Sequence, residues 1–161
     1  EGAQGFGLDI DWGDYPFVTS SHCTVGSALL NGIPPQAIRD IWGVAKAYET
    51  YVGAKKFELN NPIFSQIRSI GKEYGATTGR NRQCGWLDVP FLEKSIKING
   101  VNKVVFNKMD ILEQVNIWNI KYKENEYERF NDRRGFEEYF ETKLKVWGVE
   151  DVYFSGSPDR I

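Results

Sequence analysis

The alternation of apolar and polar positions divides the chain into helices and strands that follow one another. Between residues 62 and 71 apolar side chains recur at helical spacing, directly after an Asn61-Pro62 pair that is typical of a helix start. Asp88 can cap a second helix, and a third is predicted over residues 134–147. Helices that alternate with strands in this way indicate an α/β fold.

Short apolar runs predict the strands. Residues 41–52 are expected to form one buried strand, and residues 101–107 contain a compact apolar run that is typical of a parallel sheet. Residues 116–130 alternate around a polar break, which predicts a β-hairpin, and residues 6–10 show a short strand-like alternation. With a last strand at residues 152–154, the predicted fold is α/β, with a mostly parallel central sheet flanked by helices and a small β-hairpin.

Composition and charge narrow the class of protein. With 161 residues, 41% of them apolar, residues 1–161 fit a single domain or a fragment of a larger protein. A net charge of −2 offers no basic surface for nucleic acid, and no apolar run approaches the length of a membrane span. Cys23 and Cys84 are too few for a disulfide framework, which favours a reducing, cytoplasmic compartment.

The N-terminal segment carries acids, hydroxyls and the one histidine of the chain. Asp9 and Asp11 lack the glycine and glutamate spacing of a calcium loop, so we interpret them as turn and backbone-capping groups. Thr19 can contact a phosphate or cap a helix. His22 has neither zinc-ligand spacing nor a nucleophile elbow near it. We therefore expect no histidine-based catalysis within this chain.

The stretch GATTGRNRQCGW at residues 75–86 has the composition of a ligand-binding loop. Gly75 and Gly79 supply the backbone freedom that a tight loop needs. Arg80 and Arg82 form a forked receptor for carboxylate or phosphate, because guanidinium groups bind such anions through two parallel hydrogen bonds. An exposed basic turn is the plain alternative.

The run FNKMD at residues 106–110 follows a predicted strand and has the composition of a guanine-binding loop. The Asp110 carboxylate could accept from both N1–H and the exocyclic amine of guanine, a pair of donors that adenine lacks. The aliphatic part of Lys108 could cover the base while its ammonium stays solvated. On spacing alone, Asp110 could equally be the N-cap of a following helix.

Several stretches, in order and over essentially the whole chain, resemble the C-terminal part of the adenylosuccinate synthetase family. They are EGAQG at residues 1–5, DIDWGDYPFVTSS at 9–21, GVAKAYETYVGA at 43–54, GATTGRNRQCGWLD at 75–88, FNKMD at 106–110 and SGSPDR at 155–160. The resemblance implies a P-loop-NTPase-like synthetase fold. It also implies that GTP, with Mg²⁺, drives ligation of L-aspartate to inosine monophosphate (IMP), in a homodimeric enzyme.

The resemblance also implies which residues bind each substrate. Carried over by position, these are Gln4, Thr19 and Arg80 for IMP; Thr77, Thr78, Gly79, Arg80 and Arg82 for aspartate; and Arg82, Lys108, Met109, Asp110, Ser155, Gly156 and Ser157 for GTP. The family's usual pattern differs here at several places. It has arginine at Tyr51 and Asn81, a Gly-Pro-Phe-Pro-Thr run at residues 55–59, histidine and threonine at Trp12 and Asp14, and glycine at Ser157.

The family's N-terminal phosphate loop, catalytic aspartate and catalytic histidine have no counterpart in this chain, and His22 does not lie in that histidine's context. We therefore expect a fragment, or a chain that works with a complementary N-terminal segment, which would carry most of the magnesium ligands. The isolated chain is expected to be inactive. Two other interpretations stay open: a relative of the phage 2-aminoadenylosuccinate synthetases that acts on a guanine nucleotide, and a non-catalytic guanine-nucleotide-binding module.

Overall fold

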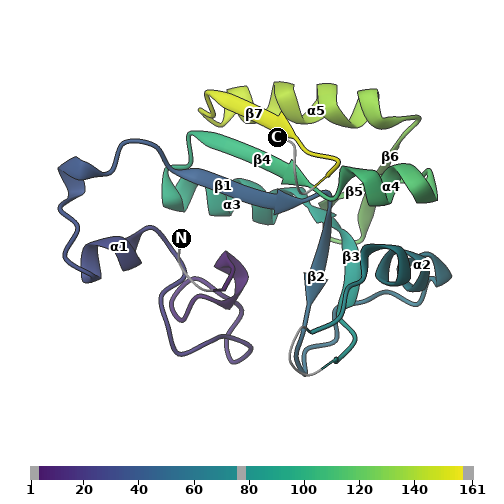
Figure 1. The fold of residues 1–161 in the computed structure, drawn as a ribbon, viewed down its shortest axis with the longest axis horizontal. Coiled ribbons are helices and arrows are strands. Elements are labelled where there is room, and N and C mark those ends of the chain that lie inside the picture. Colours follow the sequence, from purple (N-terminus) through teal and green to yellow (C-terminus); the bar gives the residue numbers. More distant parts are fainter. Residues whose placement is uncertain (1–3, 76–78, 158–161) are drawn as a thin grey trace.

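The computed structural model describes residues 4–75 and 79–157. In these ranges helices and strands alternate (Figure 1), in the order η1 (Phe6–Leu8), α1 (Gly26–Leu30), η2 (Pro35–Ala37), β1 (Trp42–Lys46), β2 (Tyr48–Tyr51), α2 (Pro62–Gly71), β3 (Gln83–Asp88), α3 (Val89–Asn99), β4 (Lys103–Asn107), α4 (Met109–Val115), β5 (Trp118–Lys123), β6 (Glu126–Phe130), α5 (Arg133–Val146) and β7 (Asp151–Phe154). None of the described helices is both long and apolar enough to cross a membrane.

The first sheet is parallel and has the strand order β1-β4-β7. Helix α5 covers one of its faces (Figure 1), where Phe106 of β4 is fully buried. The Phe106 ring lies 4.7 Å from the ring of Phe140 and stacks on Phe154 at 5.4 Å. Aromatic pairs at such distances are attractive beyond the area that they bury. This packing fixes the level at which β4 and β7 end, and with it the position of the loops that follow.

The second sheet is mixed and has the order β2-β3-β5-β6. β2 and β3 are antiparallel, β3 and β5 are parallel, and β5 and β6 form the predicted hairpin. The α/β class, the parallel strands and the hairpin are thus confirmed. Helices α2 and α3 begin as predicted, because the Asn61 and Asp88 carboxamide and carboxylate oxygens accept the N–H groups of the first helical turn.

One strand was predicted over residues 41–52, and this prediction is wrong. The chain forms β1 and β2, which belong to different sheets. The break falls at Ala47, which is fully buried and whose N–H donates to the Asn107 carbonyl oxygen at 2.9 Å. A continuous apolar pattern cannot show such a change of direction, because it does not report which strand each half will pair with. The strand predicted to be buried is also partly exposed in β1, at Trp42 and Val44.

Two further predictions need correction. Residues 6–10 are not a strand: a 3₁₀ turn, Phe6–Leu8, is followed by Asp9, whose carboxylate accepts from the N–H groups of Asp11 (2.9 Å), Trp12 (3.0 Å) and Cys23 (2.5 Å). The interpretation of Asp9 as a backbone-capping group is confirmed. The loop predicted at residues 75–86 is also too long, because its last part is the central strand β3, Gln83–Asp88.

Candidate functional site

The loops that follow β4 and β7 lie side by side. The Ser155 N–H donates to the Phe106 carbonyl oxygen at 2.7 Å, and the Met109 N–H donates to the Ser155 carbonyl oxygen at 3.3 Å. The Ser155 hydroxyl donates to the Ser157 carbonyl oxygen at 2.7 Å, which closes the second loop on itself. The structure therefore brings residues 107–110 together with residues 155–157, at the carboxyl ends of two parallel strands, where α/β folds bind ligands.

Asp110 is not an N-cap. The N-cap of α4 is Lys108, in the left-handed region at φ 63°, and Asp110 lies inside the first turn. The alternative in which Asp110 merely starts the helix is therefore wrong. The Lys108 ammonium donates to the Gly71 carbonyl oxygen at the end of α2 (3.1 Å), which connects residues 107–110 to that helix.

The segment between α2 and β3 returns on itself and presents Arg82. The Arg82 N–H donates to the Glu73 carbonyl oxygen at 3.0 Å, and the Gly75 N–H donates to the Arg80 carbonyl oxygen at 2.8 Å. Gly79 has φ 63°, as its predicted role in a tight loop requires. Thr77 and Thr78, predicted to bind aspartate, lie outside the described residues. Arg80 is exposed, so of the two predicted arginines only Arg82 is partly enclosed.

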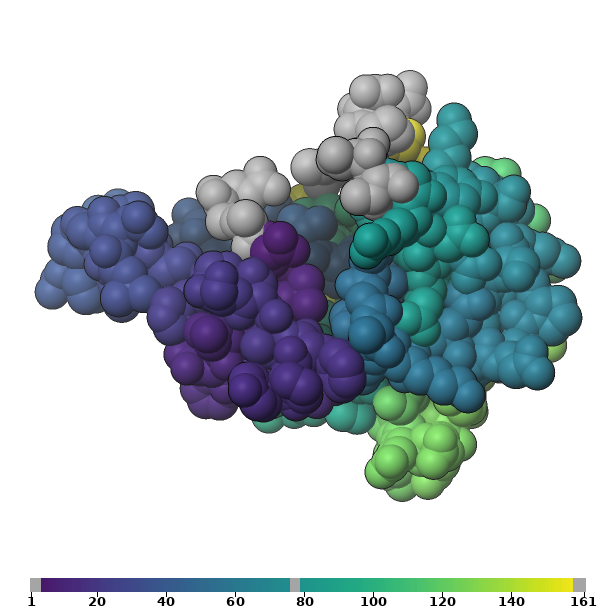
Figure 2. Space-filling view, turned by 90° about the horizontal axis from the view of Figure 1, so that it is seen from below, coloured from purple at the N-terminus to yellow at the C-terminus, as the bar shows by residue number. Residues whose placement is uncertain are grey.

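A groove of about 1210 Å³ separates the N-terminal segment from β1, β2 and β3. Figure 2 shows the N-terminal segment (purple) and the region of β2 and β3 (blue to teal) facing each other. Gln4 and Arg82, predicted to contact IMP and aspartate, line this same groove, together with Lys46. Thr19 does not: it is half-buried, and its N–H donates to the Leu8 carbonyl oxygen at 2.8 Å.

A buried carboxylate lies behind the groove wall, and sequence reasoning missed it. Glu73 is 2% exposed and accepts from Lys46, Tyr48 and Arg82. Burial alone would raise the pKa of Glu73, but the hydrogen bonds from Lys46 and Tyr48 outweigh it and hold the pKa below its usual value. The available signal was Lys46 itself, a charged residue at the end of the otherwise apolar strand β1.

A second acid of the groove was also missed. Glu49 of β2 accepts from the Asp88 N–H at 3.2 Å, and burial, assisted by the charge of Asp88, raises the pKa of Glu49 to about 7. Asp88 is itself paired with Lys121 at 2.7 Å. Carboxyl groups with raised pKa values are common at functional sites, but ion-pair networks produce them as well.

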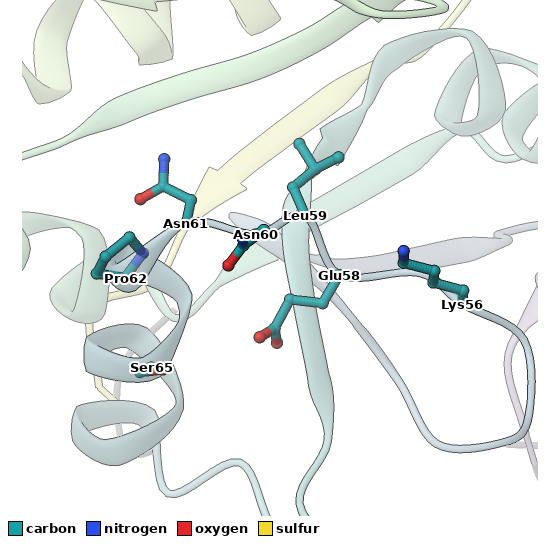
Figure 3. Close-up of a pocket in the computed structure, with 7 residues that line it drawn as sticks. All are labelled: Lys56, Glu58, Leu59, Asn60, Asn61, Pro62 and Ser65. Carbon is teal, nitrogen blue, oxygen red and sulfur yellow. The ribbon is translucent and has the colours of Figure 1, made fainter.

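Two other features of the surface contain none of the residues predicted to bind a ligand: the group Asp9, Asp11 and His22, and a hollow beside α2. One ligand atom each of Asp9, Asp11 and His22 lies within 4.8 Å of the others, but Asp9 already accepts three backbone N–H groups. A hollow of about 610 Å³ lies between residues 56–61 and the first turn of α2, and Figure 3 shows Glu58 pointing toward the helix. Glu58 pairs with Arg68, which explains its place without a ligand.

Comparison with known proteins decides the family. The family model described as adenylosuccinate synthetase matches residues 1–152. The chain belongs to the adenylosuccinate synthetase family. Curated adenylosuccinate synthetases include one from Halothermothrix orenii, 50% identical over 115 residues, and one from Brugia malayi, 48% identical over 120 residues. The matches cover 70% and 73% of this chain but only 27% and 28% of the relatives.

Solved structures agree with this family assignment. The fully ligated adenylosuccinate synthetase from Plasmodium falciparum superposes with a TM-score of 0.85 at 30% identity, over 98% of this chain and 47% of that one. The cyanophage S-2L succinoaminodeoxyadenylate synthetase, solved with dGMP and with dATP as an energy donor, gives a TM-score of 0.65 at 18% identity, over 98% of this chain and 43% of that chain. The second likeness shows a shared fold alone. This chain thus spans about half of the length of the Plasmodium falciparum relative.

Proposed function

We propose that the chain is the C-terminal portion of an adenylosuccinate synthetase and that it binds IMP, L-aspartate and the guanine of GTP. In the reaction GTP phosphorylates the purine 6-oxygen, and the aspartate amine then displaces that phosphate. The observation that carries the proposal is the meeting of residues 107–110 with residues 155–157, because the Asp110 carboxylate can then accept both guanine donors beside a second polar loop.

In this proposal the three substrates bind to neighbouring parts of the site that share Arg80 and Arg82. Gln4, Thr19 and Arg80 contact IMP, while residues 77–79 with Arg80 and Arg82 hold the aspartate carboxylates. Arg82 suits this role because its guanidinium lines the groove and is 34% exposed, so part of it can reach a ligand. Arg82 also contacts GTP. The remaining guanine contacts come from Lys108, Met109, Asp110, Ser155, Gly156 and Ser157.

Magnesium does not fit the described residues of this chain as a bound cofactor. The acid and histidine group at Asp9, Asp11 and His22 offers a ring nitrogen and a carboxylate that is already engaged, whereas Mg²⁺ prefers free oxygen ligands in octahedral geometry. We therefore assign no magnesium-dependent step to this part of the enzyme. The homodimer and the cytoplasmic location stay predictions.

The two other interpretations are less well supported. A phage-type enzyme that acts on a guanine nucleotide would account for the shared fold, but that relative is only 18% identical, against 50% for the adenylosuccinate synthetase of Halothermothrix orenii. A purely guanine-binding module would not need the loop that presents Arg82 to a groove distinct from residues 107–110.

A chimeric enzyme tests the proposal. The N-terminal portion of the Halothermothrix orenii relative, up to the start of the match, is joined to this chain, and adenylosuccinate is measured with IMP, aspartate and GTP. We expect turnover with GTP and little with ATP, and none from the 161-residue chain alone, because it lacks the phosphate loop. A folded chimera without adenylosuccinate formation, or one that uses ATP equally well, contradicts the proposal.

Arg82→Leu in the chimera should raise the KM for aspartate by about thirty- to a hundredfold. The physical reason is the loss of a charge-assisted bidentate contact, worth about 2–3 kcal/mol. The KM values for IMP and GTP serve as internal controls, and they should change much less. An unchanged KM for aspartate removes Arg82 from the aspartate site.

The outer edge of the parallel sheet supports the proposal that this chain is part of a larger unit. In the described part of the chain β1 pairs only with β4, and its Trp42 and Val44 side chains are 49% and 69% exposed. Parallel strands are normally covered on both faces. We infer that the remaining part of the synthetase covers β1.

Val44→Lys should therefore destabilise the chimera by about 2 kcal/mol while leaving the isolated chain unaffected, since only in the chimera does the lysine become buried. Val146→Lys is the matched control, because Val146 is 79% exposed on α5. Thermal melts of both variants, alone and in the chimera, provide the measurement. Equal effects of the two substitutions on the chimera show that β1 stays uncovered.

A further inference from the structure

The carboxylate of Glu73 is fully engaged by donors. Oε1 accepts from the Tyr48 hydroxyl at 2.8 Å and from the Lys46 ammonium at 2.9 Å. Oε2 accepts from Lys46 at 3.0 Å and from a terminal nitrogen of Arg82 at 3.1 Å. A carboxylate offers about four acceptor positions, and all four are used here. Lys46 also donates to the Thr50 hydroxyl at 2.8 Å, so its ammonium is held in one place.

The layering of this cluster separates the residues that can meet a ligand from those that cannot. Lys46 and Arg82 line the groove with side chains that are 24% and 34% exposed, whereas Tyr48 and Glu73 are buried behind them. Two cations beside one buried carboxylate leave a net positive charge at the groove wall, which favours an anionic ligand. Without the carboxylate, Lys46 and Arg82 would repel each other and would not both stay at this wall.

Glu73 controls the backbone of Arg82 as well as its side chain. The Glu73 carbonyl oxygen accepts the Arg82 N–H at 3.0 Å, and a bridge between Tyr74 and Asn81 continues the pairing outward. The contact between Glu73 and Arg82 engages one terminal nitrogen of a guanidinium that has five N–H donors. The remaining donors can therefore face the groove while the guanidinium plane is fixed from behind.

We infer that Glu73 is a positioning residue for the aspartate site: its buried carboxylate aims the Arg82 guanidinium into the groove, and Lys46 balances the charge of that carboxylate. The inference rests on the proposed role of Arg82 in binding aspartate. A buried ion pair contributes little net stability compared with apolar packing of the same volume. Stability alone therefore does not account for a buried carboxylate at Glu73, whereas the orientation of Arg82 does.

Two measurements test this inference. In the 161-residue chain, nitrogen-15 NMR reports whether the Arg82 guanidinium rotates freely about its Nε–Cζ bond. We expect restricted rotation in the native chain and in Tyr48→Phe, which removes a donor from the same carboxylate but leaves the Arg82 contact. We expect free rotation in Glu73→Gln, because the new amide can present a donor to the guanidinium.

In the chimera, Glu73→Gln should raise the KM for aspartate by about tenfold with kcat changed far less, and Tyr48→Phe should raise it less than twofold. If Glu73 had only a structural role, Glu73→Gln would lower the stability of the chimera and change the KM values for IMP, aspartate and GTP together. Should Glu73→Gln fail to fold, Glu73→Asp keeps the charge but is too short to reach Lys46 and Arg82 together, so it should also raise the KM for aspartate.

Restricted rotation of Arg82 in Glu73→Gln, or an unchanged KM for aspartate in that variant, overturns the inference. Failure of the proposed function gives a different result: the unmodified chimera then makes no adenylosuccinate, while the NMR measurement on the chain still decides whether Glu73 holds Arg82.

Discussion

Asp110→Asn is expected to shift the nucleotide preference of the chimera from GTP toward xanthosine triphosphate (XTP). The native carboxylate can accept from N1–H and from the 2-amino group of guanine. An amide in its place puts a donor against a donor, whereas the 2-oxo group of xanthine can accept from that amide. The expected change in discrimination is about 2–4 kcal/mol, because an unpaired buried polar group adds to the lost hydrogen bond.

The measurement is kcat/KM for GTP and XTP, with thermal melts alongside. Asp110 lies in the first turn of α4, where a negative charge interacts favourably with the helix dipole. If that were its only role, Asp110→Asn would lower the stability of the fold by about 0.3–1 kcal/mol and leave the nucleotide preference unchanged. Glu113→Gln is the matched control, since it neutralises another acid of the same helix that pairs with Arg133 at 3.3 Å. If Asp110→Asn retains the native preference for GTP, residues 107–110 do not read the base.

Glu49→Gln is expected to make the 161-residue chain more stable at pH 8 and to change little at pH 4. Burial raises the pKa of Glu49 to about 7 from a usual value of 4.5, so the folded state holds a proton that the unfolded state has lost. The stability that this proton contributes is present below pH 4.5 and is lost as pH rises to 7. At pH 8 the Glu49→Gln chain should therefore have a free energy of unfolding that is on the order of 3 kcal/mol higher than that of the native chain.

Glu73→Gln provides the control of opposite sign. The pKa of Glu73 is held below its usual value: burial would raise it, but the donors Lys46, Tyr48 and Arg82 outweigh that effect. Its charged form therefore stabilises the fold at neutral pH, and this stability is lost as pH falls through the lowered pKa. Denaturant unfolding of both variants from pH 4 to pH 8 gives the comparison. If the stability of the Glu49→Gln chain depends on pH as that of the native chain does, ionisation of Glu49 does not destabilise the fold, and the prediction is wrong.

Local sequence patterns were sufficient to predict those helices and strands whose signals lie within a few residues of one another. Asn61-Pro62 and Asp88 start helices as predicted, because a capping side chain needs only the next three N–H groups. The hairpin of residues 116–130 and the strand before residue 107 were predicted for the same reason. The family resemblance rested on linear motifs, and the match over residues 1–152 confirms it.

Tertiary structure decided what depends on contacts between distant segments. The division of residues 41–52 into β1 and β2 follows from the hydrogen bond between Ala47 and Asn107, sixty residues apart. Asp110 had two interpretations on spacing alone, and the left-handed backbone of Lys108 at the start of α4 removed one of them. A linear pattern reports which side chains prefer burial, but it does not report which distant backbone group will receive their hydrogen bonds.

The buried network is the clearest case. Sequence alone placed Arg82 in a basic loop, and it drew no attention to Lys46 or Glu73, which belong to separate segments. Folding brings Lys46 and Arg82 each within 3.1 Å of the Glu73 carboxylate, and burial of that carboxylate makes the pairing necessary. The residues proposed to bind substrate could thus be predicted from motifs. The positioning role inferred for Glu73 could not be predicted, because it exists only once Lys46 of β1 meets the segment that carries Glu73 and Arg82.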